Sequence, residues 1–208
     1  HTRYGTVTGV QTCALPILQC DVLRVNFVGE LGYEFHHPIE MQNHLFDLLM
    51  KAGAQFGIRP FGIRAMMSMA LEKSYRLVGR EMSIEYSAFE SGLQRFVHPN
   101  KGQFLGRDAL VAWQQKGFKN SFVTMEVHGV EDVDARGSEA IYLGDQIVGR
   151  CTSGGFGWRT GKSLALAMVS PDHSAVGTTL EIVILGKRYA ATIIPESPFD
   201  AENDRLRA

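Results

Sequence analysis

The part of the sequence after residue 119 consists of short strand-like runs separated by glycine-containing turns. Gly144-Asp145 and Gly186-Lys187 are each flanked on both sides by strand-forming residues, and two-residue turns of this kind connect adjacent antiparallel strands. Between residues 122 and 128, every odd-numbered position is apolar, as expected for a strand whose two faces meet different surroundings. This pattern predicts a small antiparallel β-barrel or sandwich.

The part before residue 118 mixes strand and helix patterns. Residues 21–28 alternate like a strand with one buried face, Gly29 and Gly32 delimit a turn, and a second short strand ends at Phe35. Three segments place apolar residues at helical spacing, and Gly57 follows the first of them as a helix stop. These helices are expected over about residues 41–56, 61–73 and 107–116.

The change of pattern predicts an α+β fold in two parts, at residues 19–117 and 118–208. Residues 1–18 show neither helical nor strand periodicity and lack the charged and then apolar order of a signal peptide. They are similar to translated sequencing-adaptor DNA, so we expect a non-native leader there and an upstream continuation of the real protein.

Composition excludes several classes of function. A formal charge of −1 gives no electrostatic support for a nucleic-acid partner, and no apolar run approaches the roughly 20 residues of a membrane helix. Cys13, Cys20 and Cys151 lack metal-ligand spacing, and His36-His37 has no cysteine nearby, so no metal site is expected. Ordinary unpaired thiols suggest a reducing compartment, and we expect a cytoplasmic location.

Glu34 is the first candidate binding residue. An ionised carboxylate accepts hydrogen bonds through two oxygens, so it can bind a ligand edge that presents two donors in one plane, such as the edge of a pterin ring. Gly32 would let a flat ring approach the backbone. The alternative is that Glu34 is a solvated acid on an edge strand.

Arg64 and Tyr33 are the other two candidates. The Arg64 guanidinium could bind a carbonyl or carboxylate through its fork of donors, or it could pair with an acid on the helix surface. Tyr33 could form one wall of a ligand pocket or pack under the sheet. The residue types leave both pairs of alternatives open.

Several ordered blocks between Asp21 and Arg207 resemble the glycine-cleavage T-protein (aminomethyltransferase) family, and most of all the folate domain of dimethylglycine and sarcosine dehydrogenases. These blocks are Val25–Phe35, Arg64–Lys73, Glu72–Met82, Glu90–Leu93, Lys101–Leu110 and the glycine-rich stretch Thr152–Trp158. We expect the charges of Glu72–Met82 to shape the bend after the helix without touching substrate. We expect Thr152–Trp158 to be a structural bend in the β part.

The resemblance implies a partial T-protein-like folate domain, an antiparallel sheet with helices, followed by the barrel. It assigns a pterin contact to Glu34, a folate contact to Arg64 and a pocket wall to Tyr33, whereas Glu30 is expected to cap or orient the turn. The implied ligands are tetrahydrofolate and a methylated amine of the dimethylglycine or sarcosine type, between which a one-carbon unit is transferred.

The resemblance also places the family's catalytic aspartate, and any FAD-binding domain, upstream of these residues. We therefore expect no catalytic residue in this chain and no activity from it alone, although the parent protein would be an enzyme. Three alternatives remain. One is a folate-dependent demethylase of another donor, and a second is a non-enzymatic folate-binding adaptor of the kind that assists iron–sulfur assembly. The third is a purely structural role as a domain-interface module. The adaptors carry a cysteine in a Lys-Gly-Cys block, whereas Gln103 follows Lys101-Gly102 here.

Overall fold

The computed structural model describes residues 10–15 and 18–207, with side chains from Cys20 onward. These residues form two compact units, one comprising the chain up to Met67 together with the residues from Glu202, and the other comprising Ser68–Ala201. The helix α2 (Ile63–Glu72) begins in the first unit and ends in the second. The boundary expected near residue 118 lies inside the second unit, shortly before its first barrel strand.

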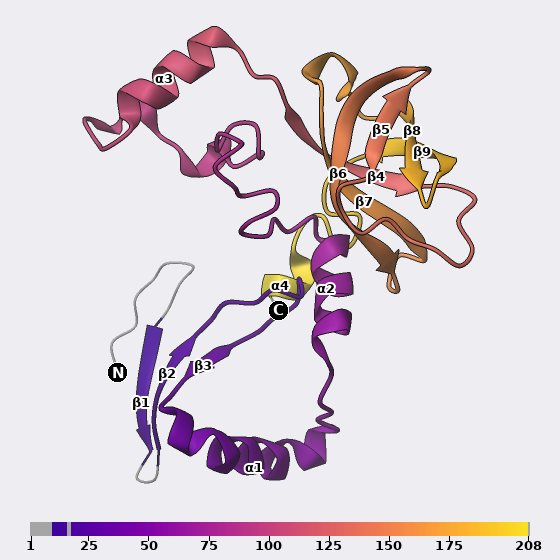
Figure 1. Cartoon of the computed structure of the whole chain (residues 1–208). Helices are drawn as coiled ribbons and strands as arrows, with labels where there is room; N and C mark the ends of the chain where they lie inside the picture. The colour runs from indigo at the N-terminus through magenta and orange to yellow at the C-terminus, as the bar shows by residue number, and fades with distance from the viewer. Residues whose placement is uncertain (1–9, 16–17, 208) are drawn as a thin grey trace. The chain divides into compact units, whose positions relative to one another are not determined.

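The first unit contains a small antiparallel sheet with the strand order β1-β2-β3 (Figure 1). Its strands are β1 (Val10–Leu15), β2 (Leu18–Leu23) and β3 (Glu34–His36). Residues 1–18 lack strand periodicity, yet the backbone of β1 pairs with β2 along its whole length. Pairing with a neighbour can define a strand that lacks alternation of its own. The rest of the leader expected at residues 1–18 consists mainly of residues 1–9 and 16–17, which lie outside the described residues.

The strand predicted over residues 21–28 ends at Leu23, because the chain turns immediately afterwards. The side-chain oxygen of Asn26 accepts hydrogen bonds from the backbone N–H groups of Val28 at 3.2 Å and Gly29 at 2.8 Å. An asparagine that bonds its own following backbone offers an alternative to strand pairing. Asn26 thus stabilises the turn, and the expectation that Glu30 caps or orients it stays a prediction.

The predicted helices are present. α1 (Gln42–Gly53) continues into a 3₁₀ turn at Ala54–Phe56 and stops at Gly57, whose φ of 72° is the left-handed conformation that glycine favours. α2 and α3 (Arg107–Lys116) lie within the expected ranges. The remaining short helices are the 3₁₀ turns Ile39–Met41, Gln94–Phe96, Pro99–Lys101 and Pro171–His173 and the C-terminal α4 (Asp204–Arg207).

The strands of the second unit form a closed antiparallel barrel in the order β4-β7-β6-β5-β8-β9. They are β4 (Ser121–Val127), β5 (Ala140–Leu143), β6 (Gln146–Gly157), β7 (Lys162–Val169), β8 (Thr179–Ile184) and β9 (Lys187–Ile194). The α+β class with a small antiparallel barrel is therefore confirmed. The glycine-rich Thr152–Trp158 belongs mostly to β6, where the pairing register with β7 shifts between Cys151 and Ser153.

Two hairpins close with short turns. Leu143 pairs with Gln146 across Gly144-Asp145, as the sequence predicts. In the β8–β9 hairpin, Ile184 pairs with Lys187, so the turn is Leu185-Gly186, one residue earlier than predicted. Both turn residues have positive φ, 48° and 81°, as a turn that matches the twist of the two strands requires.

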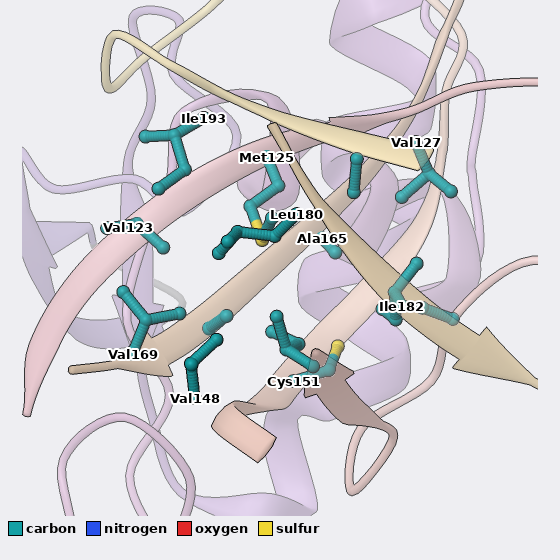
Figure 2. Close-up of a cluster of buried hydrophobic side chains, with 14 of the residues drawn as sticks. Val123, Met125, Val127, Val148, Cys151, Ala165, Val169, Leu180, Ile182 and Ile193 are labelled. Carbon is teal, nitrogen blue, oxygen red and sulfur yellow. The ribbon is translucent and has the colours of Figure 1, made fainter. Parts of the chain in front are cut away.

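The barrel encloses the main hydrophobic core (Figure 2). Met125, Leu180 and Ile193 point into its interior, and each is no more than 2% exposed. β7 is buried on both faces, because Ala165 and its alternate neighbours line the interior whereas Leu164 and its alternate neighbours pack on the outside against Leu71. The outer contact explains why residues 68–117 belong to the same compact unit as the barrel.

Candidate functional site

The three predicted ligand-binding residues all lie in the first unit. Glu34 is the first residue of β3, opposite Leu23 of β2, and its side chain is 53% exposed. One carboxylate oxygen lies 3.3 Å from Nε2 of His36, a second exposed side chain. No other hydrogen bond to Glu34 occurs within the described part of the chain, so its second oxygen remains an available acceptor. Tyr33 directly precedes the strand and is 53% exposed.

Arg64 is the second residue of α2 and is exposed. Among the residues that the structure describes, no acid pairs with its guanidinium, so the alternative of a surface ion pair is not realised there. No hydrogen bond or ion pair joins Arg64 to Glu34 either. The two side chains are thus both accessible, one an acceptor and the other a donor.

The turn before Glu34 is held by contacts that the sequence alone did not indicate. A Cβ atom on Gly32 would lie 2.7 Å from Cβ of Asn26, so the turn itself requires glycine there, whether or not a ligand approaches. The backbone N–H of Leu31 donates to the carbonyl of Arg205 at 3.1 Å, and the Arg205 guanidinium lies 4.0 Å from the Glu30 carboxylate. The C-terminal helix α4 therefore braces this turn.

The second unit contains a buried ion pair that ordinary reasoning from sequence would place on the surface. Glu72, at the end of α2, has no exposed area, and Oε2 accepts the Nε–H of Arg159 at 2.5 Å. Its other oxygen accepts the backbone N–H groups of Arg159 at 2.6 Å and Thr160 at 2.8 Å. Arg159 also stacks over the Phe199 ring at 3.7 Å, which joins the helix end, a barrel loop and the C-terminal segment.

Glu81 and Glu90 are also buried, and their carboxylates accept hydrogen bonds from nearby backbone and side-chain groups. Glu81 accepts the hydroxyl of Ser153 at 2.6 Å and the backbone N–H of Leu77 at 2.8 Å. Glu90 accepts the backbone N–H and hydroxyl of Ser87 with one oxygen and three N–H groups of Lys119 and Asn120 with the other. Burial opposes ionisation of Glu90, yet these hydrogen bonds outweigh it and hold its pKa below the ordinary value.

Lys73 is buried with them, at 2% exposure, and donates from Nζ to the carbonyls of Phe199 at 3.2 Å and Asp200 at 2.7 Å. Desolvation lowers the pKa of Lys73, and the charge of Asp200 opposes that shift. Glu72, Lys73 and Glu81 carry charges expected to shape the bend after the helix, and the expectation that they do not touch substrate stays a prediction. Their burial and internal hydrogen bonds make them parts of the scaffold.

No cluster of three or more His, Cys, Asp or Glu side chains that could hold a metal ion occurs among the described residues. Within the same part of the chain, no helix combines the length and apolarity needed to cross a membrane.

Comparisons with known proteins match both parts of this architecture. The model of the GCVT N-terminal domain matches residues 2–101, and that of the glycine cleavage T-protein C-terminal barrel domain matches residues 120–200. The first match includes the residues expected to be a leader, and that expectation stays a prediction.

Among curated proteins, the mitochondrial dimethylglycine dehydrogenase of Homo sapiens is 39% identical over 201 residues, which are 95% of this chain and 23% of that protein. An aminomethyltransferase of Desulfitobacterium hafniense (strain DSM 10664 / DCB-2) is 30% identical over 193 residues, 93% of this chain and 50% of that protein. The chain thus spans about a quarter and about half of these relatives.

The crystal structure of the glycine cleavage system aminomethyltransferase T from Bartonella henselae superposes with a TM-score of 0.79 at 22% identity, and the match covers 88% of this chain and 50% of that one. At this identity the likeness concerns the fold alone. The two domain matches, which follow one another along the chain, show that it belongs to the glycine cleavage T-protein family.

Proposed function

We propose that this chain is the folate-binding part of an aminomethyltransferase-like enzyme that transfers a one-carbon unit from a methylated amine to tetrahydrofolate. The matches to both T-protein domains, in order along the chain, support the reaction class. The identity to dimethylglycine dehydrogenase supports an amine of the dimethylglycine or sarcosine type. The observation that carries the proposal is the match to both domains in order, and Glu34, exposed at the start of β3 with a free carboxylate oxygen, is available to the ligand.

The chemistry of the exposed residues fits the ligand. A pterin edge presents a ring N–H and an exocyclic amino group, and Glu34 is acceptor-only when ionised. Arg64 offers donors that no described side chain occupies, which suits the carbonyl or the carboxylates of folate. The 53% exposed ring of Tyr33 offers a flat apolar surface beside the acid. When bound, tetrahydrofolate supplies the nucleophile, and these residues hold and orient it beside the donor.

This chain's contribution is binding and positioning. The family's acid–base aspartate, and any flavin-binding domain, would be supplied by sequence upstream of these residues. We therefore propose that the chain alone binds folate without turnover. A demethylase acting on another donor would use the same folate residues, and a profile of methyl donors with the full-length protein distinguishes the two.

The adaptor alternative needs an accessible thiol. Cys20 and Cys151 are both buried, and burial raises the pKa of the Cys151 thiol well above its ordinary value, which disfavours the reactive thiolate. Neither of the two cysteines whose side chains the structure describes is therefore exposed, and Gln103, which follows Lys101-Gly102 where the adaptors carry cysteine, favours the enzyme. We keep a cytoplasmic location as part of the proposal, although the human relative is named as mitochondrial.

The test is a calorimetric titration of the 208-residue chain with tetrahydrofolate under reducing conditions. Saturable binding that Glu34→Gln weakens supports the proposal. Binding that the substitution leaves unchanged removes Glu34 from the site.

A further inference from the structure

The second unit contains a hollow of about 310 Å³ in which three arginines meet. It lies between the turn after α2, the loop before β5 and the middle of β6, and its charged lining residues are Arg80, Arg136, Arg150 and Glu85. We call it the arginine pocket. We propose that the arginine pocket binds a small polyvalent oxyanion, carrying either a phosphate group or two or more carboxylates, through Arg136 and Arg80.

Arg136 provides the free donors. Its guanidinium has no hydrogen bond or ion pair with any described residue, although its backbone is firmly held. The Glu139 carboxylate accepts the backbone N–H groups of Arg136 at 2.8 Å and Gly137 at 2.7 Å, and Ser138 donates its N–H to the carbonyl of Cys151 at 2.8 Å. Glu139 is thereby committed to the backbone, and the arginine side chain is left for a ligand.

The loop that carries Arg136 is pressed against β6. A Cβ on Gly137 would lie 2.5 Å from the carbonyl oxygen of Thr152, and Gly137 has a φ of 122°. Ser138 has a φ of 79°, in a region that residues other than glycine rarely adopt. Backbone held in a sparsely populated conformation next to a hollow is a feature found at ligand-binding sites. Here it fixes the point from which the Arg136 side chain extends.

Arg80 is anchored on one side only. Its Nη1 donates to the carbonyls of Arg136 at 3.2 Å and Thr152 at 3.4 Å and to the hydroxyl of Ser153 at 3.4 Å. Its Nη2 and Nε have no partner among the described residues. Anchoring through one nitrogen orients the guanidinium plane and leaves its remaining donors for a ligand.

Arg150 also lines the arginine pocket and adds a third positive charge. Its Nη2 donates to the Glu85 carboxylate at 2.7 Å and to the hydroxyl of Tyr86 at 2.6 Å. The hydrogen bond to Glu85 is the largest influence that raises its pKa, so the group stays cationic. Glu85 pairs with Arg150, whereas Arg80 and Arg136 form no ion pair with a described residue, and the nearby Glu81 and Glu139 accept hydrogen bonds from Ser153 and from the backbone. Planar guanidinium forks suit the oxygens of phosphate and carboxylate, and the pocket is large enough for a small polyanion.

The test uses the full chain and two probes, inorganic phosphate and tricarballylate, each titrated by calorimetry at constant ionic strength. We expect saturable binding of at least one probe, with shifts of the backbone amide signals of Gly137 and Ser138 in ¹⁵N-correlated NMR spectra. Arg136→Gln should weaken binding about tenfold, because it removes charge-assisted hydrogen bonds. Phosphate binding alone would indicate a phosphorylated ligand, and tricarballylate binding alone a polycarboxylate.

Arg59→Gln is the matched control, since Arg59 is an exposed arginine of the first unit and the substitution changes the net charge equally. It should leave the affinity unchanged. The proposal is overturned if neither probe saturates, or if both substitutions weaken binding to the same extent, which would indicate general charge attraction. Arg136→Gln breaks no described side-chain contact, so an unchanged circular-dichroism melting curve is expected to accompany the lost affinity.

Discussion

Arg159 donates its Nε–H to Glu72 at 2.5 Å, and the two residues lie 87 positions apart in the sequence. The glutamate is fully buried and the arginine side chain is 18% exposed, so the pair is shielded from water. Through it, the end of α2 is fixed to the loop between β6 and β7, and the Phe199 ring covers the guanidinium. A contact of this kind makes the helix after Met67 part of the barrel unit.

Replacing Arg159 should therefore destabilise the second unit strongly. Arg159→Leu leaves the Glu72 charge buried with two backbone N–H groups and the Thr160 hydroxyl as its described partners, and removing one member of a buried pair costs about 3–5 kcal/mol. Urea unfolding followed by circular dichroism measures the loss. Arg188→Leu is the control, because Arg188 forms a more exposed pair with Glu181 and should cost about 1 kcal/mol or less. Equal losses would show that the buried pair has no special role.

Gly157 tests the close packing around the same carboxylate. A Cβ atom there would lie 2.6 Å from the Thr160 hydroxyl oxygen and 2.8 Å from Cγ of Glu72. Gly157→Ala should lower the free energy of unfolding by about 1–3 kcal/mol, as overpacking usually does. Gly62→Ala, which meets no atom within 4 Å, should change it by less than about 0.5 kcal/mol. If both variants unfold at the same urea concentration, the prediction is wrong, because Glu72 and Thr160 must then shift to make room for the added Cβ without loss of stability.

Glu90 should make stability depend on pH. Its pKa is held below the ordinary value of 4.5 in the folded protein, so the unfolded chain takes up the proton first as the pH falls. The stabilisation is complete above about pH 4.5 and is lost as the pH falls through the folded-state pKa. The difference in unfolding free energy between the native chain and Glu90→Gln should therefore shrink below about pH 4.5. A difference that stays constant with pH, or one matched by the exposed Glu202→Gln, would contradict this.

Local patterns predicted the helices and hairpins well, and long-range contacts explain the differences. α3 and the stop at Gly57 follow from helical periodicity and glycine, which depend on neighbouring residues only. The buried roles of Glu72 and Glu90 depend on partners 87 and about 30 positions away, and a glutamate in a single sequence gives no sign of such burial. The end of β2 depends on two hydrogen bonds that the Asn26 side chain accepts, a signal that a search for asparagine three residues before a glycine could have found.

For the candidate ligand residues, too, the sequence and the structure supplied different information. Their identity came from the resemblance, and their exposure came from the structure. Spacing alone left Glu34 as either a binding residue or a solvated acid, and its free carboxylate oxygen is compatible with both. The sequence did not predict a role for Arg136, because the pocket forms only where the folded chain places Cys151 and Thr152 next to Arg136 and Gly137.

The proposal that this chain binds without catalysis has a direct test. Supplied with tetrahydrofolate and an aminomethyl donor, the 208-residue chain should show negligible one-carbon transfer, because the family's acid–base aspartate is expected upstream. The full-length protein under the same conditions is the control. Turnover by the chain near that of the full-length protein would show that the described residues contain the catalytic group.

Glu34 and Arg64 should both weaken tetrahydrofolate binding when they are changed, although no contact joins them. Glu34→Gln replaces one acceptor oxygen with a donor and removes the charge, so two hydrogen bonds to a donor–donor edge become one. A charge-assisted hydrogen bond contributes about 1.5–3 kcal/mol, which predicts a roughly 10- to 100-fold loss of affinity. Arg64→Gln should cause a loss of similar size, because it removes the charge and most donors of the fork.

Glu30→Gln and Arg59→Gln are the matched controls in this titration. Glu30 is engaged with Arg205 and should affect binding far less than Glu34, whereas Arg59 matches Arg64 in charge and exposure. If the two contacts are made to separate polar groups of one ligand, the double variant Glu34→Gln/Arg64→Gln should lose the sum of the two single free energies. A double variant no weaker than one single variant would mean that only one of the two side chains contacts the ligand.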